Sequence, residues 1–118
     1  MIDTKLAITK LHEWQANDYF AEPEWEARGL IPSPDDVREA MHAAKNALIS
    51  ALLGAIHSNA DEEQLLLIAL AHFRACRKAR FDTEETEFLA DCIFQIAASI
   101  DLKDFFDRSE QQMLADME

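Results

Sequence analysis

Apolar residues recur at helical spacing along most of the chain, and they divide it into five segments. The spacing predicts helices near residues 4–17, from 33 for about 23 residues, from 59 to about 80, from 82 to about 99, and after 101. Only short connections separate the second to fifth helices, which favours antiparallel or steeply angled neighbours. The pattern therefore predicts an all-α fold class, with a single domain over residues 1–118 that forms a bundle of about five helices.

Polar residues that can cap a helix precede the first segment, where Asp3 or Thr4 is available, and three later segments. The later ones are Ser33 before Pro34 and two aspartates, Asn59 three residues before Glu62, and Asp82 three residues before Glu85. One stretch, DYFAEPEWEARGLIP, lacks the helical spacing of apolar residues and predicts a long irregular loop near residues 18–33. Gly54 interrupts the second predicted helix and costs about 1 kcal/mol relative to alanine, unless another backbone approaches closely or the helix bends there.

Acidic residues outnumber basic residues, and this imbalance bears on the choice of partner. The 118 residues include 23 Asp and Glu against 11 Lys and Arg, which gives a formal net charge of −12 at pH 7. Such a surface repels phosphate backbones and anionic lipid, so neither a nucleic acid nor a membrane is expected as a partner. The same charge favours a basic protein partner, although acidity also serves plain solubility.

Cysteine usage and the apolar runs point to a cytoplasmic location. Cys76 and Cys92 fall in apolar helical patterns rather than at paired, turn-rich positions, so no disulfide framework is expected. No apolar run approaches about 18 residues, and the first residues lack the pattern of a secretory leader. We therefore expect a reducing compartment, without secretion or membrane insertion.

The histidines are the main candidates for metal chemistry. Glu39 and His42 have the Glu-x-x-His spacing that places two ligands on one helical face, but a di-iron site needs this motif twice and the chain has it once. His72 and Cys76 are one turn apart, yet a structural zinc site needs four clustered ligands. With only 2 glycines the chain cannot build a phosphate-binding loop, and it has no nucleophile signature. No catalytic, cofactor-binding or metal-binding residue is predicted.

Two acidic segments and one aromatic residue are the candidates for a partner-binding surface. Acids in a first helical turn are already stabilising through the helix dipole, and a loop aromatic can simply anchor its loop to the core. Aromatic side chains rimmed by charge are also typical of protein interfaces. The candidate residues are Trp25 with Glu22, Glu24 and Glu26, and Asp82 with Glu84, Glu85 and Glu87.

One basic cluster stands apart in this acidic chain, and it consists of Arg74, Arg77, Lys78 and Arg80. Cations in the last turns of a helix offset the negative end of its dipole, which is one explanation of the cluster. The other explanation is a site for a small anion or an acidic partner helix.

A family resemblance rests on one acidic segment and on several residues before and after it. These residues are Phe20, Pro23 and Gly29, then Asn46, then Phe81-Asp82-Thr83-Glu84-Glu85-Thr86-Glu87 followed by Ile93, Ile96 and Ile100. Over roughly residues 18–102 the chain resembles a family of small helical bacterial proteins known only as a domain of unknown function. It departs from that family after Leu102, where it has neither a Trp nor a Gly-rich close. The resemblance implies a bacterial origin and no known activity.

The function predicted from these features is that of a non-catalytic, acidic protein-binding module. Its specific form is an immunity or inhibitor protein that neutralises a basic bacterial toxin, by analogy with acidic proteins that cover a toxin's positive cleft. One alternative is a structural homo-oligomer, because the third predicted helix is apolar around most of its circumference over its first half. The other is a metal-dependent enzyme built around Glu39, His42 and His72. The sequence leaves the oligomeric state open.

Overall fold

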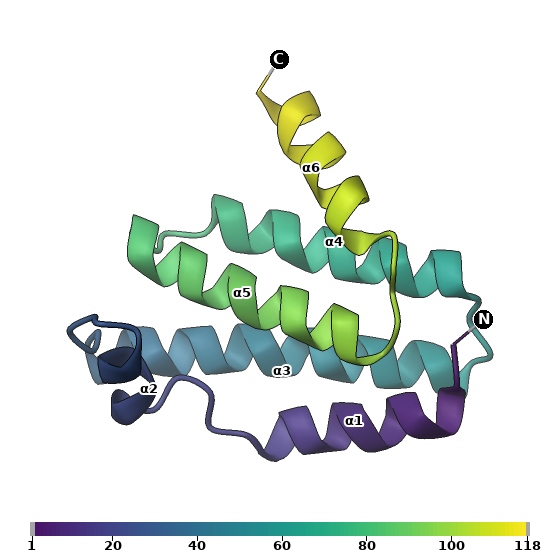
Figure 1. Ribbon diagram of the computed structural model, residues 1–118, viewed down its shortest axis with the longest axis horizontal. Coiled ribbons are helices and arrows are strands. Elements are labelled where there is room, and N and C mark those ends of the chain that lie inside the picture. The colour runs from purple at the N-terminus through teal and green to yellow at the C-terminus, as the bar shows by residue number, and fades with distance from the viewer. Residues whose placement is uncertain (1, 118) are drawn as a thin grey trace.

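The computed structural model describes residues 2–117 of the chain. Within this range the chain forms only helices: α1 (Thr4–Ala16), α2 (Glu22–Ala27), α3 (Asp35–His57), α4 (Glu62–Lys78), α5 (Thr83–Ser99) and α6 (Phe105–Asp116) (Figure 1). The predicted all-α class is confirmed. The prediction of about five helices is one short, because α2 lies in the segment expected to be an irregular loop.

Four long helices form the body of the molecule. Helices α1, α3, α4 and α5 lie alongside one another, each antiparallel to the next of them along the chain, and α5 packs against the other three (Figure 1). The short helix α2 covers one end of this body. Helix α6 packs obliquely on α4 and α5 and projects beyond them, so the molecule measures 40 × 38 × 20 Å.

Helix α2 was not predicted because it is too short for apolar residues to recur at helical spacing. It has six residues, with Pro23 in its first turn and the acids Glu22 and Glu24 favouring its amino end. Its single buried residue is Trp25, whose Nε1 donates a hydrogen bond to the carbonyl of Phe20 at 3.0 Å. Burial of one large aromatic side chain therefore holds this segment as a helix that periodicity could not reveal.

The capping predictions are right for two helices and wrong for two. Asp3 caps α1, where its side chain accepts from the amide of Leu6 at 3.1 Å. Asp82 and Glu85 form a reciprocal capping box at the start of α5, as predicted. The corresponding box on α4 is formed by Asp61 and Gln64, not by Asn59 and Glu62. At α3 the N-cap position is Pro34, which offers no capping side chain, and the hydroxyl of the preceding Ser33 donates to Glu85 instead.

Asn59 does not start α4, because its backbone ends α3. Among residues 2–117, three have a left-handed backbone, Gly29 (φ 74°), Asn59 (φ 61°) and Asp101 (φ 62°), and each terminates a helix. After α3, the amide of Ala60 donates to the carbonyl of Ala55 at 2.9 Å, and the amide of Asn59 donates to Ile56 at 3.0 Å. These two bonds make up the Schellman motif, which also closes α2 and α5. Because Asp101 belongs to the end of α5, the last helix starts only at Phe105, later than predicted.

One continuous core joins all six helices. The long helices contribute apolar faces, including Leu11 of α1, Leu48 and Leu52 of α3, Leu65 of α4 and Ile96 of α5. At the end covered by α2, edge-on contacts link the rings of Phe20, Trp25 and Phe88. Where α6 meets the body, similar contacts link Phe73, Phe94 and Phe105. The aromatic residues thus attach the two smaller helices to the body.

Candidate functional site

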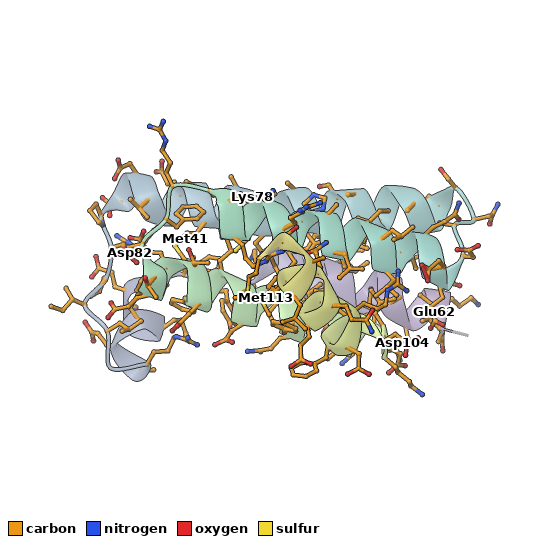
Figure 2. The ribbon with its side chains drawn as sticks, turned by 90° about the horizontal axis from the view of Figure 1, so that it is seen from above. Met41, Glu62, Lys78, Asp82, Asp104 and Met113 are labelled. Atoms are coloured by element: carbon orange, nitrogen blue, oxygen red, sulfur yellow. The ribbon has the colours of Figure 1, made fainter. Side chains whose placement is uncertain are left out.

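Helix α2 and the first turns of α5 meet at one end of the molecule. The rings of Trp25 and Phe88 lie 4.8 Å apart between their centroids, and Arg28 binds Asp91 of α5 at 2.9 Å. The guanidinium of Arg28 also covers the Phe88 ring, 4.4 Å from its centroid. Figure 2 shows Asp82 at this end and Glu62 at the opposite end. The two acidic segments singled out in the sequence are therefore neighbours in space.

The structure divides the eight candidate residues into an exposed group and a buried pair. The exposed group consists of Glu22, Glu24, Glu26, Asp82, Glu84 and Glu87. Trp25 and Glu85 are only 1% and 7% exposed. Trp25 anchors α2 to the core, and Glu85 accepts hydrogen bonds from the Asp82 amide at 2.9 Å and from the Ser33 hydroxyl. Neither of these two side chains offers a surface to a partner.

Two arginines at this end, Arg28 and Arg38, are engaged within the molecule, whereas the exposed Arg80, two residues before Asp82, takes part in no ion pair of the described residues. Arg28 is paired with Asp91, and Arg38 is paired with Glu22 and Asp35 while its Nε donates to the carbonyl of Ser33 at 2.9 Å. Within residues 2–117, five of the six exposed candidates take part in no ion pair. Asp82 caps α5 by accepting from the Glu85 amide, and the other four are Glu24, Glu26, Glu84 and Glu87. We call these four residues the acidic end.

A groove runs beside the acidic end along α3. It has a volume of about 500 Å³ and is lined by Asp18, Phe20, Asp35, Arg38, Glu39, His42, Ala43 and Asn46. Arg38 connects it to α2 through Glu22. His42 Nδ1 and Asn46 Oδ1 are buried in the wall of this groove without a hydrogen-bond partner. Asp35 is paired with Arg38, but the carboxylates of Asp18 and Glu39 and these two atoms suit a further cationic group.

Three residues of this groove were singled out in the sequence, although not as parts of a groove. Glu39, His42 and Asn46 recur at spacings of three and four residues, which places them on one face of α3. The sequence suggested a metal for the first two, and the family resemblance included the third. Asp18 and Phe20 reach the groove from the connection between α1 and α2, and only the tertiary structure brings them there.

The residues proposed for metal chemistry do not gather into a ligand set. His72 lies on α4, where its Nδ1 is 3.0 Å from the carbonyl of Ile68. Within the described part of the chain, no group of three His, Cys, Asp or Glu side chains is placed to hold a metal ion.

Both thiols are buried in the core. Burial raises the pKa of the Cys76 thiol to about 11 and the pKa of the Cys92 thiol to about 12. At neutral pH these side chains are protonated, apolar in character and without nucleophilic reactivity. Their role is to pack.

A buried lysine escaped the sequence analysis. Lys45 lies on the core face of α3 with none of its surface exposed, and its Nζ donates to the carbonyl of Trp14 at 2.8 Å and to that of Asn17. These carbonyls belong to the end of α1, so the lysine caps that helix from a neighbouring one. Burial lowers the pKa of Lys45. The sequence did contain an indication that Lys45 is buried, because it follows Met41 by four residues and so lies on the apolar face of α3.

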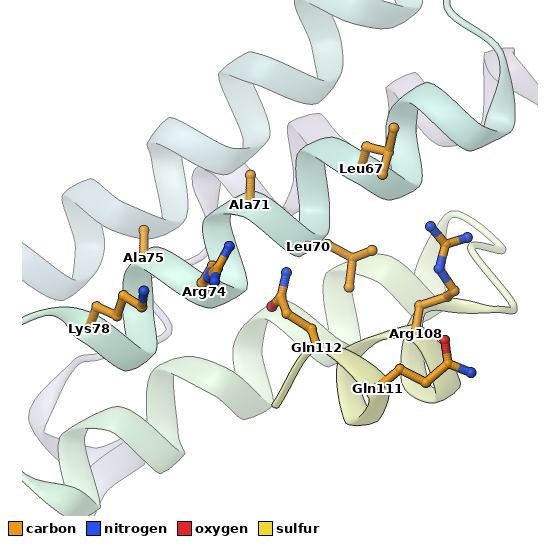
Figure 3. Close-up of a pocket in the computed structure, with 9 residues that line it drawn as sticks. All are labelled: Leu67, Leu70, Ala71, Arg74, Ala75, Lys78, Arg108, Gln111 and Gln112. Atoms are coloured by element: carbon orange, nitrogen blue, oxygen red, sulfur yellow. The ribbon is translucent and has the colours of Figure 1, made fainter. Parts of the chain in front are cut away.

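The basic cluster borders a second groove, between α4 and α6 (Figure 3). This groove has a volume of about 650 Å³, and its walls include Leu67, Ala71, Ala75, Arg74, Lys78 and Arg108. Arg74 and Arg77 both bind the carboxylate of Asp116, so part of the cluster holds α6 against α4. The arginines at the end of α4 therefore also bind α6, in addition to offsetting the dipole of α4.

Comparison with known protein families, with curated proteins and with solved structures finds no match. The resemblance to a bacterial family of unknown function stays a prediction. Among residues 2–117, none of the helices has the length and apolar content needed to cross a lipid bilayer.

Proposed function

We propose that this protein is a non-catalytic binding module that recognises a basic protein through its acidic end. In its specific form it is an immunity or inhibitor protein that covers the positive cleft of a basic bacterial toxin. One observation carries the proposal: Glu24, Glu26, Glu84 and Glu87 are exposed and outside any ion pair of the described residues, and of the three arginines near them Arg28 and Arg38 are engaged with other carboxylates.

The scaffold under the acidic end supports this proposal because it holds the charges in place before binding. Trp25 and Phe88 fix α2 to α5, and the ion pair of Arg28 with Asp91 joins the same two helices. A preorganised charged surface does not have to be ordered when the partner arrives, so less conformational entropy is lost. The net charge of −12 also steers a basic partner toward the chain and raises the association rate.

The groove along α3 supports the same kind of partner at shorter range. A lysine or arginine side chain brings several N–H donors on an apolar stem, and the groove offers the carboxylates of Asp18 and Glu39, which take part in no ion pair of the described residues. Asn46 Oδ1 can accept from such a donor after a small side-chain adjustment, and so can His42 Nδ1 when the ring proton is on Nε2. We expect a basic side chain of the partner to enter this groove.

The test compares two double variants with the same change in net charge. Glu24→Lys with Glu84→Lys reverses two charges of the acidic end. The control, Glu62→Lys with Asp104→Lys, reverses two exposed charges at the opposite end of the molecule (Figure 2). Glu24, Glu84 and Glu62 all lie in first helical turns, so the stability costs are similar.

Each variant is immobilised and used to capture proteins from a lysate of the source organism at low and high salt, with identification by mass spectrometry. We expect the wild type and the control to retain one basic protein at low salt, and the acidic-end variant to lose it. Stoichiometric addition of the wild type should then inhibit the retained protein. Equal retention by both variants, or an acidic retained protein, would contradict the proposal.

A further inference from the structure

Exposed large apolar side chains gather on the helices that form the second groove. The chain has six such residues among those described: three belong to α4 or α6, namely Leu67 (51% exposed), Phe106 (59%) and Leu114 (64%), and Met117 (81%) directly follows α6. Single exposed apolar residues are normal on a protein surface, but a gathering on two packed helices marks an interaction surface. Because α6 projects from the body, its far half is open to another molecule (Figure 1).

The groove between α4 and α6 has an apolar floor and a basic rim. Leu67, Ala71 and Ala75 follow one another along α4, and the two alanines leave room for the backbone of another helix to approach (Figure 3). Arg74, Lys78 and Arg108 lie along its edges, and two of them are paired within the chain, Arg74 with Asp116 and Arg108 with Glu63. Lys78 has no ion-pair partner among residues 2–117. The occupant should therefore be a helix that carries both apolar and acidic side chains.

Helix α6 has an outward face of that composition. Asp107, Glu110 and Leu114 are all exposed, and their spacings of three and four residues place them on one side of the helix. Met117 lies three residues after Leu114 and extends the same face. The inward side of α6 is already used, since Phe105 and Ser109 are buried against the body. The outward face is thus complementary in charge and polarity to the groove of another copy.

We propose that this chain forms a two-fold dimer in which α6 of each copy lies in the α4–α6 groove of the other. Two-fold symmetry makes the two contacts identical, so the assembly closes at two copies and covers the exposed apolar residues of both. The net charge of −12 on each copy opposes association. At physiological ionic strength, however, charges more than about 8 Å apart are screened, while groups in direct contact across the groove are screened much less.

The test uses two variants that each reverse one half of the contact. The groove variant, Ala71→Glu with Lys78→Glu, makes the groove acidic, and the helix variant, Asp107→Lys with Glu110→Lys, makes the outward face of α6 basic. All four positions are exposed, so each variant should fold. Sedimentation velocity at physiological salt measures the mass over a range of concentrations. We expect the wild type to dimerise and each variant alone to be monomeric, because like charges then meet across the groove.

Mixing the two variants in equal amounts should restore the dimer. The acidic groove of one variant then meets the basic α6 of the other, and the unaltered groove and helix supply the second contact. A variant that failed only through loss of stability would not recover on mixing. A third variant, Leu114→Ser, keeps the charge and removes apolar contact area from both sides, so the dissociation constant should rise at least about tenfold.

Two controls match the charge changes elsewhere on the surface. Lys5→Glu with Thr9→Glu on α1 matches the groove variant, and the acidic-end variant Glu24→Lys with Glu84→Lys matches the helix variant. Both should dimerise as the wild type does. The dimer is overturned if the wild type stays monomeric at every concentration, if the groove and helix variants still dimerise alone, or if their mixture remains monomeric. None of these results depends on whether a basic protein binds the acidic end.

Discussion

Replacing Glu85 tests whether this carboxylate, counted in the sequence among the partner-binding acids, instead stabilises the fold. It lies in the first turn of α5 next to Glu84, which has the same side chain and a similar position in the helix. Glu84 is exposed, whereas Glu85 is 7% exposed. One carboxylate oxygen accepts from the amide of Asp82 at 2.9 Å, and the other accepts from the hydroxyl of Ser33.

The expected cost follows from these two hydrogen bonds. Glu85→Ala leaves the Asp82 amide and the Ser33 hydroxyl without their acceptor, and bonds to an ionised group contribute about 1.5–3 kcal/mol each. Both groups lie near the surface, where water replaces part of the loss, so we expect a decrease of about 2–3 kcal/mol in the free energy of unfolding. Glu84→Ala removes only an exposed charge near the helix dipole and should cost a few tenths of a kcal/mol.

Urea denaturation followed by circular dichroism measures both changes, with the slope against denaturant checked for each variant. Glu85→Gln keeps one acceptor oxygen and should cost less than Glu85→Ala. The double variant Ser33→Ala with Glu85→Ala should cost less than the sum of the single variants, by about 1 kcal/mol, because the two side chains share a bond. If Glu85→Ala is no more destabilising than Glu84→Ala, the structural role assigned to Glu85 is wrong.

Three further predictions concern stability. The Cys92 thiol has a pKa of about 12 in the folded chain against an ordinary value of 9.0, so above pH 9 the thiol is deprotonated first in the unfolded chain. This group should therefore lower the free energy of unfolding by up to about 1.4 kcal/mol per pH unit above pH 9. Urea denaturation between pH 9 and 11 should show a smaller pH dependence of the free energy of unfolding for Cys92→Ala than for the wild type, and an equal pH dependence would argue against a buried thiol. Gly54 has no atom within 4 Å of an added Cβ, so Gly54→Ala should stabilise by about 0.5–1 kcal/mol, whereas Gly29→Ala, at φ +74°, should destabilise by about 1 kcal/mol. Opposite shifts in thermal midpoint check this pair, and shifts of the same sign would contradict it. Lys45→Met leaves the carbonyls that cap α1 without a donor and should cost about 1–3 kcal/mol in thermal unfolding, while an unchanged midpoint would mean that the two bonds contribute nothing net.

The sequence predicted the long helices well and the candidate site only in part. Apolar periodicity located α1, α3, α4 and α5, and the pair Asp82 and Glu85 predicted the start of α5 correctly. The same spacing rule failed at Asn59, which lies between α3 and α4. Its left-handed backbone ends α3, so it does not cap α4. For Trp25 the sequence left open an anchor or an interface role, and contact with Phe88 makes it an anchor.

Local patterns determined what lies within a few residues of each position: the helical periods, the capping box of α5, the net charge and the lack of a catalytic motif. Tertiary packing decided the rest, because it joins residues far apart in the chain. The bond between Ser33 and Glu85 spans 52 residues, and the one from Trp14 to Ser99 spans 85. The same packing buries Lys45 at the end of α1, pairs Arg28 with Asp91 and Arg38 with Glu22, and leaves the outward face of α6 exposed. Periodicity says that a face is apolar, but only the arrangement of the neighbouring helices decides whether that face is covered.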